Sequence, residues 1–258
     1  MVYSEAAFEV DALDLLGELE WKPVNGKELA PGSGERDSWR EIVLRGRLLN
    51  ALRNLNPDVP DEYLQQAMAE VVTAQSQSAI AENRRLHEIL VEGYRGIEYY
   101  DPNGKRQNPT ITFFSRDPSK NDYIAANQIT IRNLDKERRF DVVLYVNGMP
   151  LAIIELKQSG STATAENAFN QLRTYVEEFP MAFRFANIVV ASDGIDAIYG
   201  TPFTPREHMS TWRVDDDGEP FEQGPLVVVD GEQMTEFDML MWGLFLSLIH
   251  ISEPTRRY

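Results

Sequence analysis

The chain has 258 residues, with 25 basic and 41 acidic side chains and therefore a formal net charge of −16. This length suits one large domain or two small ones, and 43% hydrophobic and 26% charged residues indicate a globular rather than a disordered protein. The absence of cysteine excludes disulfide scaffolds, thiolate zinc sites and cysteine nucleophiles. The 3 scattered histidines are too few for a histidine-rich metal site.

Membrane insertion and autonomous DNA binding are both disfavoured. No apolar run approaches the roughly 20 residues that span a bilayer, and the N-terminus lacks the basic-then-apolar pattern of a signal peptide. We therefore expect a soluble, cytoplasmic protein without a membrane partner. A pI near 4.6 argues against tight DNA binding by this chain alone, because basic side chains drive affinity for phosphates. The negative charge is still compatible with a reaction on DNA if another domain or subunit holds the duplex.

Helical patterns dominate the first hundred residues. Apolar side chains recur three and four residues apart, Ser38 and Glu41 have the spacing of a capping box, and Gly93 is a helix stop signal. We predict helices over Glu5–Leu19, Ser38–Leu55, Asp61–Ile80 and Asn83–Glu92.

Short runs rich in Ile, Val, Thr, Tyr and Phe follow, separated by turn residues, and they predict strands. These runs are Gly96–Tyr100, Thr110–Phe114, Tyr123–Ile131, Phe140–Val146 and Leu151–Lys157. Helical spacing returns over Thr164–Phe179, Ala186–Ala191 is typical of a strand buried on both faces, and Leu226–Asp230 predicts one more strand. The order predicts a single α/β domain.

The segment Phe140–Lys157 (FDVVLYVNGMPLAIIELK) carries the most informative polar residues. Asp141 opens an apolar strand, Asn147-Gly148 is a hairpin signal, and the returning strand ends in Glu155-Leu-Lys157. Residues two apart in a strand share a face, so Glu155 and Lys157 project together. Two carboxylates can hold Mg²⁺, and a lysine beside them can position a water or stabilise charge on a phosphate. This set suits phosphodiester hydrolysis, although an ion pair between Glu155 and Lys157 at a solvated strand end accounts for the spacing equally well.

Strand parity adds a geometric condition. A plain two-residue turn at Asn147-Gly148 would place Asp141 on the face opposite Glu155. We therefore predict a bulge or an odd-numbered loop between Asp141 and Glu155, for example a three-residue connection in which Gly148 is left-handed.

The same segment resembles the PD-(D/E)xK nuclease motif, with Phe140 in place of the eponymous proline. More specifically, NGMPLAIIELK followed by AFNQLRTY is similar to the N-terminal nuclease domain of the restriction (R) subunit of type I restriction-modification enzymes. The resemblance covers Ser4 to Phe245, including LNPDVP at Leu55–Pro60. In that family a Gln-x-x-x-Tyr motif follows the lysine, and here it is Gln171 to Tyr175.

The resemblance implies a restriction-endonuclease-like α/β core, a mixed sheet flanked by helices, with an N-terminal helical region. It also implies that Asp141 and Glu155 bind Mg²⁺ and that Lys157 serves the attacking water. Gln171 and Tyr175 would support cleavage by contacting DNA near the site. Many nucleases of this fold add an acid from an upstream helix, for which Glu82 and Glu92 are candidates here.

The implied function is that of a metal-dependent DNA endonuclease domain of a type I site-specific deoxyribonuclease. Its partners would be DNA and the modification (M) and specificity (S) subunits. No G-x-x-x-x-G-K-[ST] phosphate loop occurs, so ATP would act only through a motor region outside this chain. Two alternatives remain open, namely a non-catalytic subunit-interaction module and a stand-alone PD-(D/E)xK nuclease.

The C-terminal residues 246–258 have a different character. LSLIHISEPTR resembles one translated frame of a transposon adapter used in sequencing libraries. We therefore expect residues 1–245 to form the nuclease domain with its N-terminal helices, and residues 246–258 to be a non-native tail.

Overall fold

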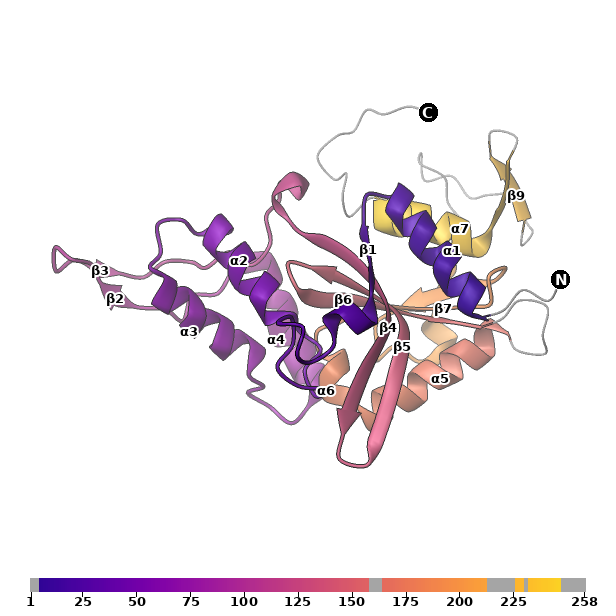
Figure 1. The fold of residues 1–258 in the computed structure, drawn as a ribbon, viewed down its shortest axis with the longest axis horizontal. Coiled ribbons are helices and arrows are strands. Elements are labelled where there is room, and N and C mark those ends of the chain that lie inside the picture. Colours follow the sequence, from indigo (N-terminus) through magenta and orange to yellow (C-terminus); the bar gives the residue numbers. More distant parts are fainter. Residues whose placement is uncertain (1–4, 158–163, 213–225, 230–231, 247–258) are drawn as a thin grey trace.

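A six-stranded mixed sheet forms the centre of the computed structural model, which describes residues 5–157, 164–212, 226–229 and 232–246 (Figure 1). The strand order is β1-β4-β5-β6-β7-β8. β1 runs parallel to β4 and β6 parallel to β7, whereas the other neighbours are antiparallel. The strands are β1 (Lys22–Asn25), β4 (Tyr123–Asn133), β5 (Lys136–Val146), β6 (Met149–Leu156), β7 (Ile188–Ser192) and β8 (Ala197–Gly200).

Helices cover both faces of this sheet, because its central strands are apolar on both sides. On one face lie α1 (Glu5–Glu18), α7 (Glu236–Leu240) and the π-helical η4 (Met241–Leu246), which share one apolar cluster with that side of the sheet. On the other face lie α5 (Ala165–Glu178) and α6 (Pro180–Phe183). The predicted α/β architecture, a mixed sheet flanked by helices, is therefore confirmed.

A helical lobe extends from the second face (Figure 1). It contains α2 (Arg45–Leu55), α3 (Asp61–Val72), α4 (Ala79–Glu92) and a small hairpin of β2 (Tyr99–Tyr100) with β3 (Arg106–Gln107). The remaining elements are η1 (Gly26–Leu29), η2 (Pro118–Lys120), η3 (Arg206–His208) and a hairpin of β9 (Leu226–Val229) with β10 (Glu232–Thr235). No helix among the described residues is long and apolar enough to cross a membrane.

The predicted start of the second helix at Ser38 is wrong, because α2 begins at Arg45. The segment before it serves the sheet instead. Ile42 and Val43 are buried in the core, and the Leu44 amide donates to the Gly148 carbonyl (2.8 Å) in the β5–β6 turn. A backbone committed to this tertiary hydrogen bond does not start a helix there.

The predicted helix Asp61–Ile80 is two helices, with α3 ending at Val72 and α4 beginning at Ala79. Ser78 caps α4 by accepting a hydrogen bond from the Ala81 amide (3.3 Å). The end of α3 is fixed from outside the helix, since the Val72 carbonyl accepts from Arg184 Nη2 (2.6 Å). Local periodicity does not reveal such a partner.

Two of the predicted strands are largely irregular. Only Tyr99–Tyr100 of the run Gly96–Tyr100 is a strand, and Ile111 forms an isolated bridge with Tyr94. Ile97, Ile111 and Phe113 of these runs are buried in the apolar cluster that the helical lobe shares with the sheet, so burial rather than strand pairing explains these apolar residues. The other predicted strands are confirmed, including Leu226–Val229. Of the expected tail, residues 247–258 lie outside the described part of the chain.

Candidate active site

The turn between β5 and β6 has two residues. Asn147 and Gly148 have φ angles of 52° and 80°, and Val146 pairs with Met149, as in a type I′ hairpin. The three-residue connection that we offered as an example is therefore wrong. Glycine is required at 148, because a Cβ there would lie 2.4 Å from the Leu44 carbonyl oxygen.

A bulge follows this turn in β6. Tyr145 pairs with Pro150, whereas Leu144 pairs with Ala152, so Leu151 is an extra residue on one strand. The Leu151 carbonyl accepts a hydrogen bond from the Asn187 amide (2.8 Å) on the far side of the strand. The predicted bulge between the two carboxylates is thus confirmed. Because of the extra residue, the β6 side chains beyond Leu151 pair with side chains of β5 that a regular two-residue hairpin would place on the opposite face of the sheet.

The shifted register brings Asp141 and Glu155 to facing positions. β5 and β6 pair as far as Val142 and Ile154, the residues next to these two carboxylates. Beyond that pair the ladder stops, and Asp141 Oδ2 accepts the hydrogen bond of the Leu156 amide (2.8 Å). Asp141 is 4% exposed and therefore satisfies a buried backbone group while facing Glu155.

Glu155 carries a carboxyl group with a strongly raised pKa. It is fully buried, and burial followed by the negative charge of Asp141 raises its pKa to about 9. Its Oε2 atom is buried and receives no hydrogen bond from a described donor group, and a side-chain hydrogen bond with Asp141 contributes to the raised pKa. Two buried carboxyl groups in contact fit a hard divalent cation, which would neutralise both.

Lys157 completes the cluster from the end of β6. Its amide donates to the Ser192 carbonyl (2.9 Å), which fixes the backbone against β7. Its ammonium Nζ lies 3.0 Å from Glu155 Oε1 and 3.1 Å from the Leu156 carbonyl oxygen. The contact between Lys157 and Glu155 is therefore buried, with side chains 12% and 0% exposed, and is not at a solvated strand end. Burying an ammonium and a carboxyl group is costly, so fold stability alone does not account for this contact.

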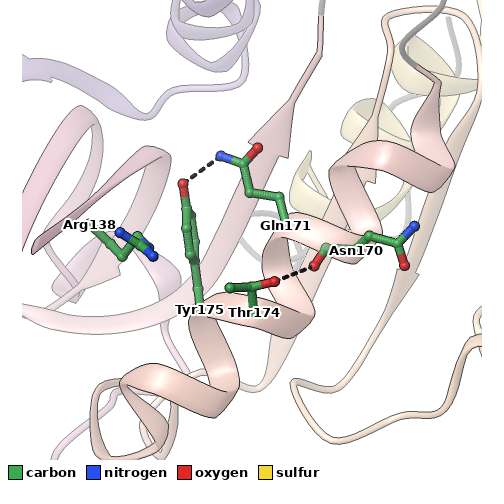
Figure 2. Close-up of a pocket in the computed structure, with 5 residues that line it drawn as sticks. All are labelled: Arg138, Asn170, Gln171, Thr174 and Tyr175. Atoms are coloured by element: carbon green, nitrogen blue, oxygen red, sulfur yellow. Dashed lines mark hydrogen bonds between the residues drawn. The ribbon is translucent and has the colours of Figure 1, made fainter. Parts of the chain in front are cut away.

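Gln171 and Tyr175 form a hydrogen-bonded pair on α5, in which Gln171 Nε2 donates to the Tyr175 hydroxyl oxygen (Figure 2). The centres of the Tyr175 and Phe140 rings are 5.7 Å apart. Burial and then the charge of Glu155 raise the pKa of the Tyr175 hydroxyl, which places it within electrostatic reach of the carboxylates. The structure thus brings Asp141, Glu155 and Lys157 together and places Tyr175, with Gln171 hydrogen-bonded to it, within electrostatic reach of them.

The two upstream acids that we considered do not join them. Glu82 is buried in the helical lobe and pairs with Arg85 (Oε2–Nη2 2.8 Å), and Glu92 is exposed at the end of α4. Within the described residues no three His, Asp or Glu side chains gather closely enough to hold a metal ion. A cation at Asp141 and Glu155 would therefore complete its shell with backbone oxygens, water or substrate oxygens.

A buried acid that the sequence analysis missed lies on α1. Glu9 is 3% exposed and accepts a hydrogen bond from Gln128 Nε2 (3.1 Å). Gln128 has a φ of 54°, and its two neighbours in β4 pair with the two neighbours of Asp141 in β5. Glu9 lies three and seven residues before Ala12 and Leu16 on the buried stripe of the helix, and that spacing was the available signal.

Comparison with known proteins identifies the family. The family described as "Type I restriction enzyme R protein N terminus" matches residues 2–208. A protein of Methanocaldococcus jannaschii, named for the endonuclease subunit of the type I restriction enzyme MjaIXP, is 29% identical over 245 residues, 91% of this chain and 23% of that protein. The HindI endonuclease subunit of Haemophilus influenzae is 28% identical over 219 residues, 83% of this chain and 21% of that protein.

A third relative, the type I restriction enzyme EcoprrI endonuclease subunit of Escherichia coli, is 37% identical over 76 residues, 28% of this chain and 24% of that protein. The chain thus spans less than a quarter of the length of the first two relatives. The match over residues 2–208 includes the whole cluster from Asp141 to Tyr175. The chain belongs to the family of type I restriction enzyme R proteins, to whose N-terminal region it corresponds.

Proposed function

We propose that this chain is the metal-dependent DNA endonuclease domain of a type I restriction enzyme R subunit. One observation carries the proposal. Asp141 and Glu155 face each other across β5 and β6 in a buried setting, with Lys157 Nζ 3.0 Å from Glu155 Oε1. A fold that only needed a stable sheet would fill these positions with apolar side chains, since burying two carboxylates is costly.

Mg²⁺ suits this donor set, because it is bound through a few carboxylates and otherwise keeps water or phosphate oxygens. When bound, it would polarise a phosphoryl oxygen and acidify a water. Asp141 and Glu155 would hold the ion. Lys157 would orient the attacking water or offset negative charge that develops on the phosphate.

Other parts of the enzyme would hold the DNA. The net charge of −16 opposes the approach of phosphates, and the match covers only 23% and 21% of the first two relatives, which are thus much longer than this chain. We propose that M and S subunits select the DNA and that ATP acts through a motor in the remainder of the R subunit. This chain would then supply the cleavage centre alone.

Lys157→Ala in the complete R subunit, assembled with M and S subunits, tests this assignment. DNA cleavage should be lost while ATP hydrolysis stays within about twofold of wild type, because the lysine lies at the cleavage centre. The matched control is Lys120→Ala, which removes an exposed lysine paired with Asp117 (3.8 Å). Unchanged cleavage by Lys157→Ala would indicate an interaction module, and loss of both activities would indicate a structural role of the strand.

A further inference from the structure

A surface pocket lies beside the carboxylate cluster and extends past the Gln171–Tyr175 pair. It has a volume of about 460 Å³, and it opens between the start of β5 and the exposed side of α5 (Figure 2). Its lining residues are Arg138, Asn170, Gln171, Thr174 and Tyr175. One of them, Tyr175, is close enough to Glu155 for the negative charge of that carboxyl group to raise the pKa of its hydroxyl, so the pocket adjoins the carboxylate cluster.

We propose that this pocket binds a backbone phosphate of the DNA strand being cut, next to the scissile one, with Arg138 as its main contact. The inference rests on the proposed function and adds a substrate subsite to it. Arg138 and Asp141 are three residues apart on β5, about 10 Å along a strand. That distance is of the order of one to two phosphate spacings.

The polar chemistry of the lining favours an anion. None of the five lining residues is acidic, although 41 of the 258 residues are Asp or Glu. Because Gln171 donates to the Tyr175 hydroxyl oxygen, the hydroxyl proton remains available to donate elsewhere. Thr174 Oγ1 donates to the backbone carbonyl of Asn170 one turn earlier in α5 (3.0 Å; Figure 2), so the polar groups aimed at the Arg138 side of the pocket come from Gln171 and Tyr175.

Ion pairing and ring contact orient the Arg138 side chain, while the local group of charges stays positive. Its Nε and Nη2 lie 2.7 and 2.9 Å from the two Glu178 carboxylate oxygens, and its guanidinium carbon lies 5.7 Å from the centre of the Tyr175 ring. Lys136 Nζ approaches the same carboxylate at 3.4 Å. Two cations thus share one carboxylate, and the group keeps a net positive charge. A pre-oriented guanidinium loses little freedom when it binds a phosphate.

The chain provides a matched control, an arginine that pairs with another glutamate of α5. Arg206 pairs with Glu166 at the other end of α5 (2.6 Å) and lies 5.8 Å from the centre of the Phe169 ring. Arg138→Met and Arg206→Met therefore each remove one cation from an arginine, glutamate and aromatic group. Only the first of these groups lines the pocket.

The first experiment measures binding of the full chain to a fluorescent DNA duplex at low salt, about 0.02 M, and its salt dependence. Arg138→Met should weaken binding about tenfold and lower the slope of log affinity against log salt by about 1. Arg206→Met should leave both within about twofold of wild type. Equal effects of the two variants would overturn the proposal.

A second variant guards against loss of folding. Glu178→Gln removes the carboxylate that partly neutralises Arg138, so it should tighten DNA binding severalfold, a gain that misfolding does not produce. Glu166→Gln is its control and should not. Failure of Glu178→Gln to tighten binding would also overturn the subsite, whereas intact cleavage by Lys157→Ala would overturn the proposed function instead.

Discussion

Replacing Glu155 by glutamine should stabilise the metal-free protein while removing its proposed activity. The pKa of Glu155 is raised from 4.5 to about 9, so at neutral pH the folded protein keeps a proton that the unfolded chain releases. For a raised pKa, the contribution to stability is fully present below the unfolded value and is lost as pH rises toward the folded value. The wild type therefore loses stability as pH rises. The Glu155→Gln variant does not, because glutamine does not titrate.

The size of this effect follows from linkage. Each pH unit between the two pKa values lowers stability by about 1.4 kcal/mol. At pH 7.5, about three units above the unfolded pKa, Glu155→Gln should therefore be more stable than wild type by up to about 4 kcal/mol. At pH 4.5 the two proteins should differ little, because the glutamine amide is close in shape to a protonated carboxyl group.

Urea unfolding in EDTA between pH 4.5 and 8.5 measures the difference directly. The control is Glu166→Gln, an exposed glutamate on α5 whose removal should change stability by less than about 1 kcal/mol at every pH. Added Mg²⁺ should stabilise wild type and leave Glu155→Gln unchanged, since only the wild type can bind it. An equal pH slope for wild type and Glu155→Gln would refute the reasoning.

Three further outcomes are expected. Gly148→Ala should destabilise the fold by more than about 1 kcal/mol in urea unfolding, because residue 148 has φ 80° and a Cβ would meet the Leu44 carbonyl; equal stability would show that the turn is misassigned. The isolated chain should bind duplex DNA more weakly than 1 μM at about 0.15 M salt in anisotropy titrations, because of its net charge; submicromolar binding would contradict the tethered-nuclease account. Mg²⁺ affinity, measured by calorimetry, should rise with pH up to about 9, since Glu155 must lose its proton to bind; affinity independent of pH would contradict the assignment of Glu155.

The sequence predicted the strands of the site because their signals are local. The period-two alternation placed Glu155 and Lys157 on one face, and Asn147-Gly148 marked the turn. Parity arithmetic then required an irregularity, and the structure places it at Leu151. That position could not be predicted, because it depends on a hydrogen bond to Asn187 in a distant segment.

The errors have the same physical origin. Residues 38–44 have a helical pattern, yet the Leu44 amide is bound to the β5–β6 turn. Glu82, one of the two candidates for an upstream acid, is instead buried in the helical lobe, where it pairs with Arg85. Glu9, in contrast, carried a sequence signal, a carboxylate on the apolar stripe of an amphipathic helix, which was available and was overlooked.

The central claim is that Asp141 and Glu155 together hold one divalent cation. Mn²⁺ bound to the full chain can be counted by electron paramagnetic resonance, in wild type, Asp141→Asn, Glu155→Gln and the control Glu166→Gln. The account predicts one bound ion in wild type and the control, and a loss of that ion in both site variants. Undiminished Mn²⁺ binding by Asp141→Asn and Glu155→Gln would contradict it.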